Sequence, residues 1–234
     1  MIRLNIYLFV FVMTIFTTSS ASGQSNDVYI EQVGDALGLV INQTGNNNNV
    51  GGIDDDFTLE GDNMGINIDQ TGDGNSIDGQ IIKADGVIAN IDMVGNSNQF
   101  DVDMGTTGDV SDSTLDVTVV GDTNIIDLTT GSNDSAIGAD IDIAITGSEN
   151  QMTSVIDSDT ATLNTTVDGD LNTINTTQLG WSDNSITMTL SGSDNQIDIL
   201  QSNELQSSVI DLDTTMSGGS IEINQTSSGV GVQP

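Results

Sequence analysis

The sequence contains no cysteine and no histidine, and its single proline, Pro234, is the last residue. Without cysteine no disulfide can form, so packing and hydrogen bonds must hold the fold together. Nucleophilic triads need a base that histidine usually supplies, so we predict that the chain is not an enzyme. The remaining catalytic alternative is a pair of carboxylates that hydrolyses a glycoside. The lack of internal proline favours uninterrupted strands.

Basic residues are also scarce, because only Arg3 and Lys83 oppose 35 acidic residues, and the formal net charge is −33. Such a chain cannot neutralise phosphates, so we expect no nucleic-acid partner and no attraction to anionic membranes. We expect no resident cofactor, and only diffuse screening of the acidic surface by divalent cations.

Two acidic clusters could supply oxygen ligands for Ca²⁺. They are Asp54-Asp55-Asp56 and Asp168-x-Asp170-x-Asn172. Neither has the glycine and closing glutamate of an EF-hand loop, and the glycine-rich calcium nonapeptide of some β-helices is missing. Specific calcium binding is therefore left open.

The first 21 residues have the pattern of a secretory signal peptide. Arg3 precedes an apolar stretch from Ile6 to Phe16, and Ser19-Ser20-Ala21 forms a small-residue cleavage site. We predict cleavage after Ala21. No later segment is apolar enough to cross a bilayer, so we expect no membrane insertion after signal removal and a secreted, extracellular or cell-surface product.

Seven copies of Gly-x-x-Asn-x-apolar follow one another at intervals of 22 to 27 residues. They are Gly45/Asn48/Val50, Gly72/Asn75/Ile77, Gly95/Asn98/Phe100, Gly121/Asn124/Ile126, Gly147/Asn150/Met152, Gly169/Asn172/Ile174 and Gly192/Asn195/Ile197. Gly218 continues the interval without the asparagine. A regular interval of this length predicts a repeat architecture, which favours assembly, adhesion or surface recognition over catalysis.

Apolar and polar residues alternate on both sides of each copy. Leu115, Val117 and Val119 precede Gly121, for example, and Ile126 follows it. Period-two alternation predicts half-buried strands. Gly and Asn tolerate the positive φ of tight turns, so we expect a four-residue turn at each copy and a second, more variable turn between copies. We expect each turn asparagine to bond its own turn or the asparagine of the next rung.

We therefore predict an all-β fold, a β-solenoid of stacked strand–turn–strand repeats of about 22–27 residues each. The predicted organisation is a signal peptide at 1–21, an N-terminal segment with a degenerate first repeat at 22–40, solenoid repeats at 41–226 and a C-terminal tail at 227–234. In the degenerate repeat Gln32 precedes Gly34, but Leu37 replaces the asparagine.

Residues 41–48 and 68–75 carry Gln-x-Gly-x-x-Asn between alternating segments. This motif resembles the curlin repeat of curli fibre subunits, and the likeness extends over roughly residues 30–226. The resemblance implies inner Gln and Asn ladders, export through a curli-type secretion pore, and self-association into functional-amyloid fibres. The positions that match the family's repeat residues are Gln43, Gly45, Asn48, Gln70, Gly72, Asn75, Gly95, Asn98, Gly121, Asn124, Gly147, Asn150, Gly169, Asn172, Gly192 and Asn195.

From Gly95 onward the glutamine position holds an apolar residue. These residues are Met93, Val119, Ile145, Val167, Leu190 and Met216. A glutamine ladder is therefore expected only near the N-terminus. An inward apolar side chain contributes about 1.5–3 kcal/mol when fully buried, so either residue type fits a stacked rung.

The sequence thus predicts an exported structural protein, a curlin-like amyloid subunit or an accessory of extracellular fibres in biofilm or adhesion. The alternative is a monomeric acidic β-solenoid that acts as an adhesin or binds a surface, ice included. Ice-binding solenoids carry outward Thr-x-Thr in every rung, whereas here adjacent pairs such as Thr129-Thr130 and Thr165-Thr166 should alternate between faces. Strand propensity explains these pairs without a binding role.

Overall fold

The computed structural model describes residues 2–7, 14–19, 26, 28–51, 57–82, 84–95, 97–105, 110–131, 136–157, 159–180, 183–203 and 208–227. The regular secondary structure in these ranges consists of strands alone, and the strands stack as a β-solenoid. The predicted all-β solenoid is therefore confirmed.

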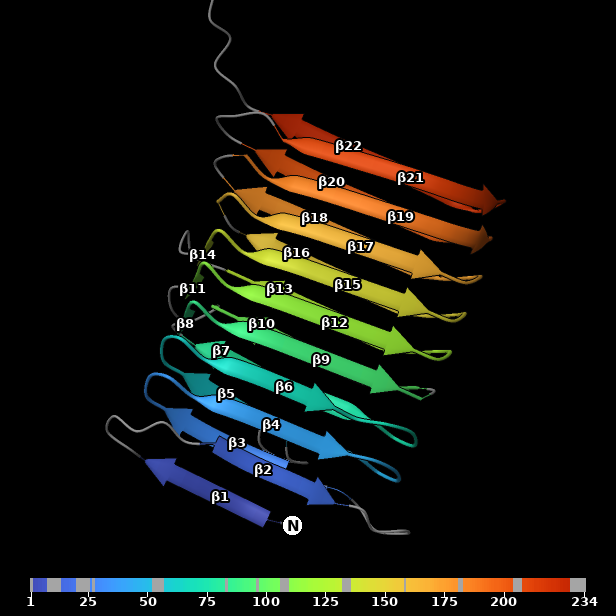
Figure 1. Cartoon of the computed structure of the whole chain (residues 1–234). Coiled ribbons are helices and arrows are strands. Elements are labelled where there is room, and N and C mark those ends of the chain that lie inside the picture. Colours follow the sequence, from blue (N-terminus) through green and yellow to red (C-terminus); the bar gives the residue numbers. More distant parts are fainter. Residues whose placement is uncertain are drawn as a thin grey trace, which may run out of the picture.

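Two parallel sheets lie face to face along the whole stack (Figure 1). The ten-stranded sheet contains β1 (Ile2–Tyr7), β3 (Val28–Val33), β5 (Phe57–Glu60), β7 (Ser76–Ile82), β10 (Gln99–Met104), β13 (Ile125–Thr130), β16 (Gln151–Asp157), β18 (Thr173–Gly180), β20 (Gln196–Asn203) and β22 (Ser220–Ser227). The nine-stranded sheet contains β2 (Thr14–Ser19), β4 (Gly38–Gln43), β6 (Gly65–Asp69), β9 (Ile88–Val94), β12 (Thr114–Val120), β15 (Asp140–Thr146), β17 (Thr162–Asp168), β19 (Ser185–Ser193) and β21 (Val209–Ser217).

Equivalent residues of successive repeats lie beside one another in both sheets. In the nine-stranded sheet Leu115 pairs with Ile141, and Ile141 pairs with Leu163. In the ten-stranded sheet Phe100 pairs with Ile126. Each pass of the chain therefore adds one strand to each sheet, and rows of equivalent side chains run along the stack.

The core lies between the two sheets, where the alternating apolar side chains meet. In β15, Ile141, Ile143 and Ile145 are buried, whereas Asp140 and Asp142 are exposed. The same alternation separates the threonine pairs: Thr130 and Thr165 face inward and are buried, while their neighbours face outward. The predicted half-buried strands are thus confirmed by the burial pattern.

Two corners join the sheets. The first corner lies at the end of a strand of the nine-stranded sheet, and the seven Gly-x-x-Asn copies occupy this corner at β4, β6, β9, β12, β15, β17 and β19. The second corner returns the chain from the ten-stranded sheet and varies in length. Three of these second corners carry the two-residue strands β8 (Ala84–Asp85), β11 (Val110–Ser111) and β14 (Ala136–Ile137), which pair as a small third sheet. Sequence reasoning predicted the variable turn but not this sheet.

The second corner has its own inward position, which the sequence analysis did not identify. Backbone hydrogen bonds connect this position from rung to rung, as in Ile88 N–H to Met64 O at 2.9 Å. Its occupants are all buried: Leu37, Met64, Val87, Ser113, Ala139, Ala161 and Asn184. Gly34 and Leu37 belong to this corner, so they are not a degenerate Gly-x-x-Asn copy. The domain boundary predicted between residues 40 and 41 falls inside β4, and the regular stack begins earlier.

Gly218 is also displaced from its predicted place. The pairing of β19 with β21 sets Gly192 beside Met216 and Ser193 beside Ser217. Gly218 therefore lies two positions beyond the expected glycine. Met216 likewise lies outside the glutamine row of the nine-stranded sheet, which ends with Thr214 next to Leu190.

The predicted signal peptide contributes strands at one end of the stack. β1 pairs with β3, and β2 pairs with β4, in parallel over six residues each. Cleavage after Ala21 stays a prediction. It would remove both strands and make β3 and β4 the first strands of their sheets.

Candidate assembly interface

The asparagines of the first corner form a continuous row in the interior. Asn98, Asn124, Asn150, Asn172 and Asn195 are each 0–1% exposed. The backbone N–H of each of the first four donates to the side-chain Oδ1 of the next asparagine along the row, at 2.8–2.9 Å. The row thus supplies acceptors for corner amides that lie outside the strand ladders.

The side-chain amides close the same corners. Asn98 Nδ2 donates to Gly95 O at 2.9 Å, and Asn124 Nδ2 donates to Gly121 O at 2.7 Å. Asn124 Nδ2 also lies 2.9 Å from Asn150 Oδ1. The repeat asparagines from Asn98 to Asn195 therefore hold the turn from inside with their side chains and do not adopt the positive φ expected of turn asparagines, although Asn46 in the first copy does.

In the corners from Gly95 to Gly192, positive φ falls on the first and third positions. The third position is left-handed in five successive corners, and its occupants are Ser97, Thr123, Glu149, Leu171 and Asp194. The first position is glycine for a steric reason. A Cβ on Gly147 would lie 2.1 Å from Gly121 O, and one on Gly169 would lie 2.0 Å from Gly147 O. Corners of successive rungs can therefore approach only through glycine.

The two predicted N-terminal glutamines are stacked as the motif implies. Gln43 Nε2 donates to Gln70 Oε1 at 2.8 Å, and both side chains are buried. Gln43 Nε2 also donates to Asn49 O, and Gln70 Nε2 donates to Ser76 O at 3.1 Å. Further along this row the apolar residues Met93, Val119 and Ile145 are buried in place of glutamine.

A second glutamine row lies in the ten-stranded sheet, near the C-terminal end. Gln201 Nε2 donates to Gln178 Oε1 at 2.8 Å, and Gln225 Nε2 donates to Gln201 Oε1 at 2.9 Å. Gln178 and Gln201 are fully buried. The expectation of a glutamine ladder only near the N-terminus is therefore wrong. The missed signal is a glutamine six residues after Asn172 and Asn195.

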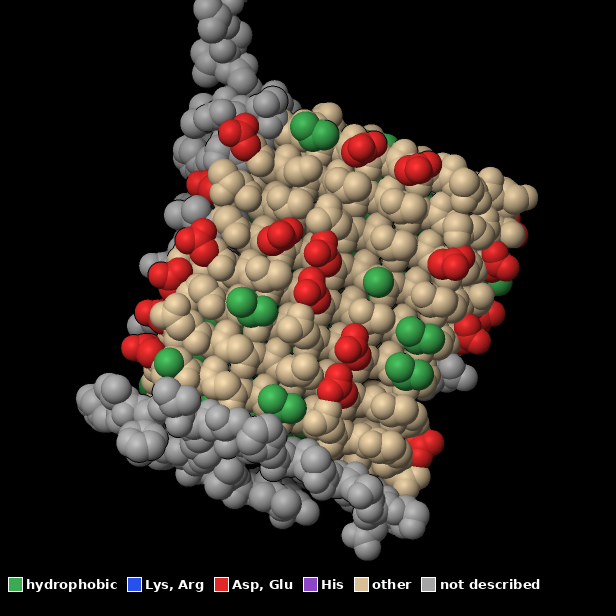
Figure 2. All heavy atoms as spheres, viewed as in Figure 1, with side chains coloured by type: hydrophobic (Ala, Val, Ile, Leu, Met, Phe, Trp, Pro, Cys, Tyr) green, Lys and Arg blue, Asp and Glu red, His purple; other side chains and the backbone are tan. Residues whose placement is uncertain are grey.

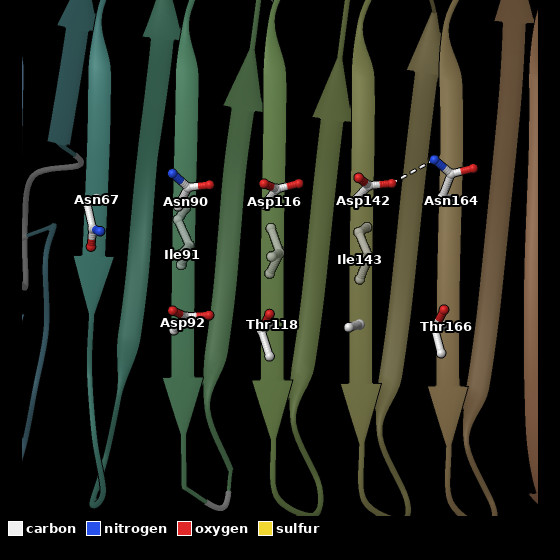
Figure 3. A pocket seen from close by; sticks show the side chains of 12 residues that line it. Asn67, Asn90, Ile91, Asp92, Asp116, Thr118, Asp142, Ile143, Asn164 and Thr166 are labelled. Atoms are coloured by element: carbon white, nitrogen blue, oxygen red, sulfur yellow. Dashed lines mark hydrogen bonds between the residues drawn. The ribbon is translucent and has the colours of Figure 1, made fainter.

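The outward face of the nine-stranded sheet is polar and acidic (Figure 2). An open depression of about 490 Å³ crosses five of its strands. One register row runs along it, made of Asn67, Asn90, Asp116, Asp142 and Asn164 (Figure 3). Asn164 Nδ2 donates to Asp142 Oδ1 at 2.7 Å.

Asp116 is the titratable group that this row perturbs. Burial raises the pKa of its carboxyl above 3.8, and the neighbouring charges of Asp142 and Asp140 raise it further. The protonated form is therefore favoured in the folded chain more than in the unfolded chain.

The candidate calcium ligands between residues 168 and 172 do not converge. Asn172 faces the interior, where its Oδ1 accepts from Asn150 N, whereas Asp168 faces solvent and accepts from Ser191 Oγ at 2.5 Å. Asp170 Oδ1 accepts from Ser193 N. Asp54-Asp55-Asp56 lies outside the described residues. Within the described ranges, no group of three or more acidic side chains could hold a metal ion.

The C-terminal rung leaves its inner side chains uncovered. Ile221 and Ile223 of β22 are 40% and 47% exposed, although their neighbours Ile197 and Ile199 in β20 are 1% and 0% exposed. Ile210, Leu212 and Met216 of β21 are only half-buried against the core. β21 and β22 are the last strands of their sheets. An apolar surface flanked by two unpaired strand edges is a template for another chain.

No helix in the described part of the chain is long and apolar enough to cross a membrane. No protein-family model, curated protein or solved structure matches this chain. The likeness to the curlin repeat rests on the residues of the chain itself.

Proposed function

We propose that this chain is an exported structural protein, a curlin-like subunit or accessory of extracellular fibres that acts in a biofilm matrix or in adhesion. The observation that carries the proposal is the uncovered C-terminal rung. Ile221 and Ile223 repeat an inner pattern that β7, β10, β13, β16, β18 and β20 all bury, so a further rung would bury them as well. Addition of a second chain is the simplest source of that rung.

The interior also supports an assembling protein. Parallel strands in register, with Asn and Gln rows along the stack, are the arrangement found in cross-β fibrils. The rows Asn98 to Asn195 and Gln178 to Gln225 are of this kind. Export follows from the predicted signal peptide, and passage through a curli-type pore follows from the resemblance alone.

The charge of the surface would control the rate of assembly. Asp78, Asp101 and Asp127 occupy one outward row of the ten-stranded sheet. Carboxylates stacked about 4.8 Å apart repel by roughly 0.9 kcal/mol per pair even in water. Salt and divalent cations screen such repulsion, and protonation of carboxylates as the pH falls weakens it. We therefore expect the lag time of fibre growth to shorten in millimolar Ca²⁺ and as the pH falls from about 7 to about 4.

The test is fibre growth by purified residues 22–234, followed by Thioflavin T fluorescence and electron microscopy. Ile223→Lys places a charge in the uncovered inner row, and Ile88→Lys places the same charge at an outward position that is 55% exposed. Loss of about 1.5–3 kcal/mol of apolar burial should raise the critical concentration at least about tenfold for Ile223→Lys. Ile88→Lys should leave it nearly unchanged.

Two outcomes would contradict the proposal. The first is a wild-type chain that stays monomeric at micromolar concentration, at neutral and at acidic pH. The second is an equal loss of assembly in both variants, because the uncovered rung would then have no special role.

The alternative function, a monomeric solenoid that binds a surface, is favoured by the outward polar rows of the depression between Asn67 and Asn164. Outward threonines such as Thr166 and Thr189 occupy neighbouring rungs of that face, but Ala144 interrupts their row. A monomer in sedimentation velocity that also slows ice recrystallisation would support this function over fibre formation.

A further inference from the structure

With β1 removed, one register row of the ten-stranded sheet would begin and end with a glutamine, whereas in the full chain Ile6 of β1 lies beside Gln32. Its register positions are held by Gln32, Leu59, Ile81, Met104, Thr130, Ile156, Gln178, Gln201 and Gln225. The residues two positions earlier match as well, because Ile30 precedes Gln32 and Ile223 precedes Gln225. The first strand of the predicted mature chain and its last strand therefore carry the same sequence pattern, Ile-x-Gln, at matching register positions.

The edge of β3 is occupied in the full chain. β1 pairs with it from Ile2 beside Val28 to Tyr7 beside Val33. β1 lies within the predicted signal peptide. Its removal would leave β3 as an edge strand with its hydrogen-bonding groups unpaired on that side.

We propose that, once residues 1–21 are removed, β3 of one copy pairs in parallel with β22 of a second copy, with Gln32 beside Gln225. This inference rests on the proposed function and names the contact that extends the fibre. Until cleavage, β1 occupies the place of the second copy, so the uncleaved chain cannot accept a partner at this end. The joint extends the row Gln178–Gln201–Gln225 by one further glutamine.

The side chains select this register over its neighbours. With Gln32 beside Gln225, Ile30 lies beside Ile223, and the outward pairs are Glu31 with Asn224 and Tyr29 with Glu222. No carboxylate then faces a carboxylate. A slip of one residue exchanges the inner and outward faces.

Slips of two residues are also unfavourable. One of them places Glu31 beside Glu222 and buries Gln32 against Ile223, so two like charges meet and an amide loses its partner. The opposite slip places Ile30 against Gln225. Only the proposed register stacks amide on amide and apolar on apolar.

Engineered cysteines test the register directly, because the native chain has none. In the joint, the Cα atoms of Glu31→Cys and Asn224→Cys would lie about 4.8 Å apart, within the range of a disulfide. The matched control is Glu31→Cys with Thr226→Cys, which is offset by two residues to about 8 Å, beyond disulfide reach. Both pairs remove one carboxylate and lie on the outward face. Within one chain the two residues are eight strand spacings apart, so any disulfide is intermolecular.

Mild oxidation of the cleaved protein should give a ladder of covalent oligomers on non-reducing gels for the in-register pair and none for the offset pair. The full chain with residues 1–21 and the in-register pair should give no ladder. Equal crosslinking of both pairs, or of the cleaved and full chains, would overturn the inference. Fibres that grow without the in-register crosslink would overturn the joint and leave the proposed function standing. If neither crosslinks nor fibres form, both the joint and the proposed function are overturned.

Discussion

The corner asparagines give the sharpest test of how the interior is held. Asn124→Val keeps the size of the side chain but removes its polar atoms. Asn98 N–H then loses its acceptor, and Gly121 O loses the amide 2.7 Å away. The contact of Asn124 Nδ2 with Asn150 Oδ1 is lost as well.

The magnitude follows from these contacts. A buried N–H without a partner costs about 1–3 kcal/mol, and each ordinary hydrogen bond contributes about 1 kcal/mol. The apolar surface of valine returns about 1 kcal/mol. We therefore expect the free energy of unfolding of Asn124→Val to fall by about 2–4 kcal/mol, with a melting temperature lower by roughly 5–10 °C.

Urea unfolding followed by circular dichroism measures the change. Asn164→Val is the control, because Asn164 donates one hydrogen bond on the outward face and its loss should change stability by only about 0.5 kcal/mol. Asn48→Val, near the N-terminal end of the stack, should cost less than Asn124→Val because it has fewer stacked neighbours. Equal stability of Asn124→Val and Asn164→Val would refute the role of the asparagine row.

Three further substitutions probe the corners and the outward row. Gly147→Ala should lower the free energy of unfolding by about 3 kcal/mol or more, because its Cβ would lie 2.1 Å from a carbonyl oxygen. The control Gly65→Ala, whose Cβ would have no atom within 4 Å, should be nearly neutral. Similar urea midpoints for the two variants would contradict the steric argument. Leu171→Asn should raise the free energy of unfolding by about 0.5–1 kcal/mol, because asparagine tolerates the left-handed backbone at this position, where the side chain is 53% exposed. The control Leu171→Val should lower stability, and an equal loss in Leu171→Asn would contradict this explanation. Because the pKa of Asp116 is raised in the folded chain, its contribution to the free energy of unfolding grows as the pH falls from above that pKa towards 3.8. Asp116→Asn should therefore be more stable than wild type at neutral pH, and its stability should change less with pH. If the urea midpoints of Asp116→Asn change with pH as steeply as those of wild type, Asp116 is not the source of the pH dependence.

The sequence predicts the strands and the first corner well because both leave a pattern that repeats along the chain. Alternation places Ile141, Ile143 and Ile145 inside, and the interval between glycines sets the number of residues in each rung. The corner glycines are fixed by contact with the rung before, so the pattern Gly-x-x-Asn is visible without a structure.

The remaining features depend on register between distant strands. Gly218 follows Gly192 at the expected interval but does not lie beside it, because β21 extends to Ser217 and places Met216 next to Gly192. The row Gln178–Gln201–Gln225 belongs to the other sheet, where positions must be counted from the asparagine rather than from the glycine. The second corner has no fixed residue type, since Leu37, Ser113 and Asn184 all fit its inward position. Such a position is visible only once neighbouring rungs are paired.

The unequal strand numbers of the two sheets have a mechanical consequence. Without β1 and β2, the ten-stranded sheet keeps nine strands and the nine-stranded sheet keeps eight. A joint between β22 and β3 makes the first sheet continuous from copy to copy, but it leaves β4 two strand spacings, about 10 Å, from β21 of the neighbouring copy. One face of the fibre would be an unbroken ribbon and the other would carry a notch at every joint. Bending would concentrate at the notches, which would give the fibre flexible points at intervals of one subunit.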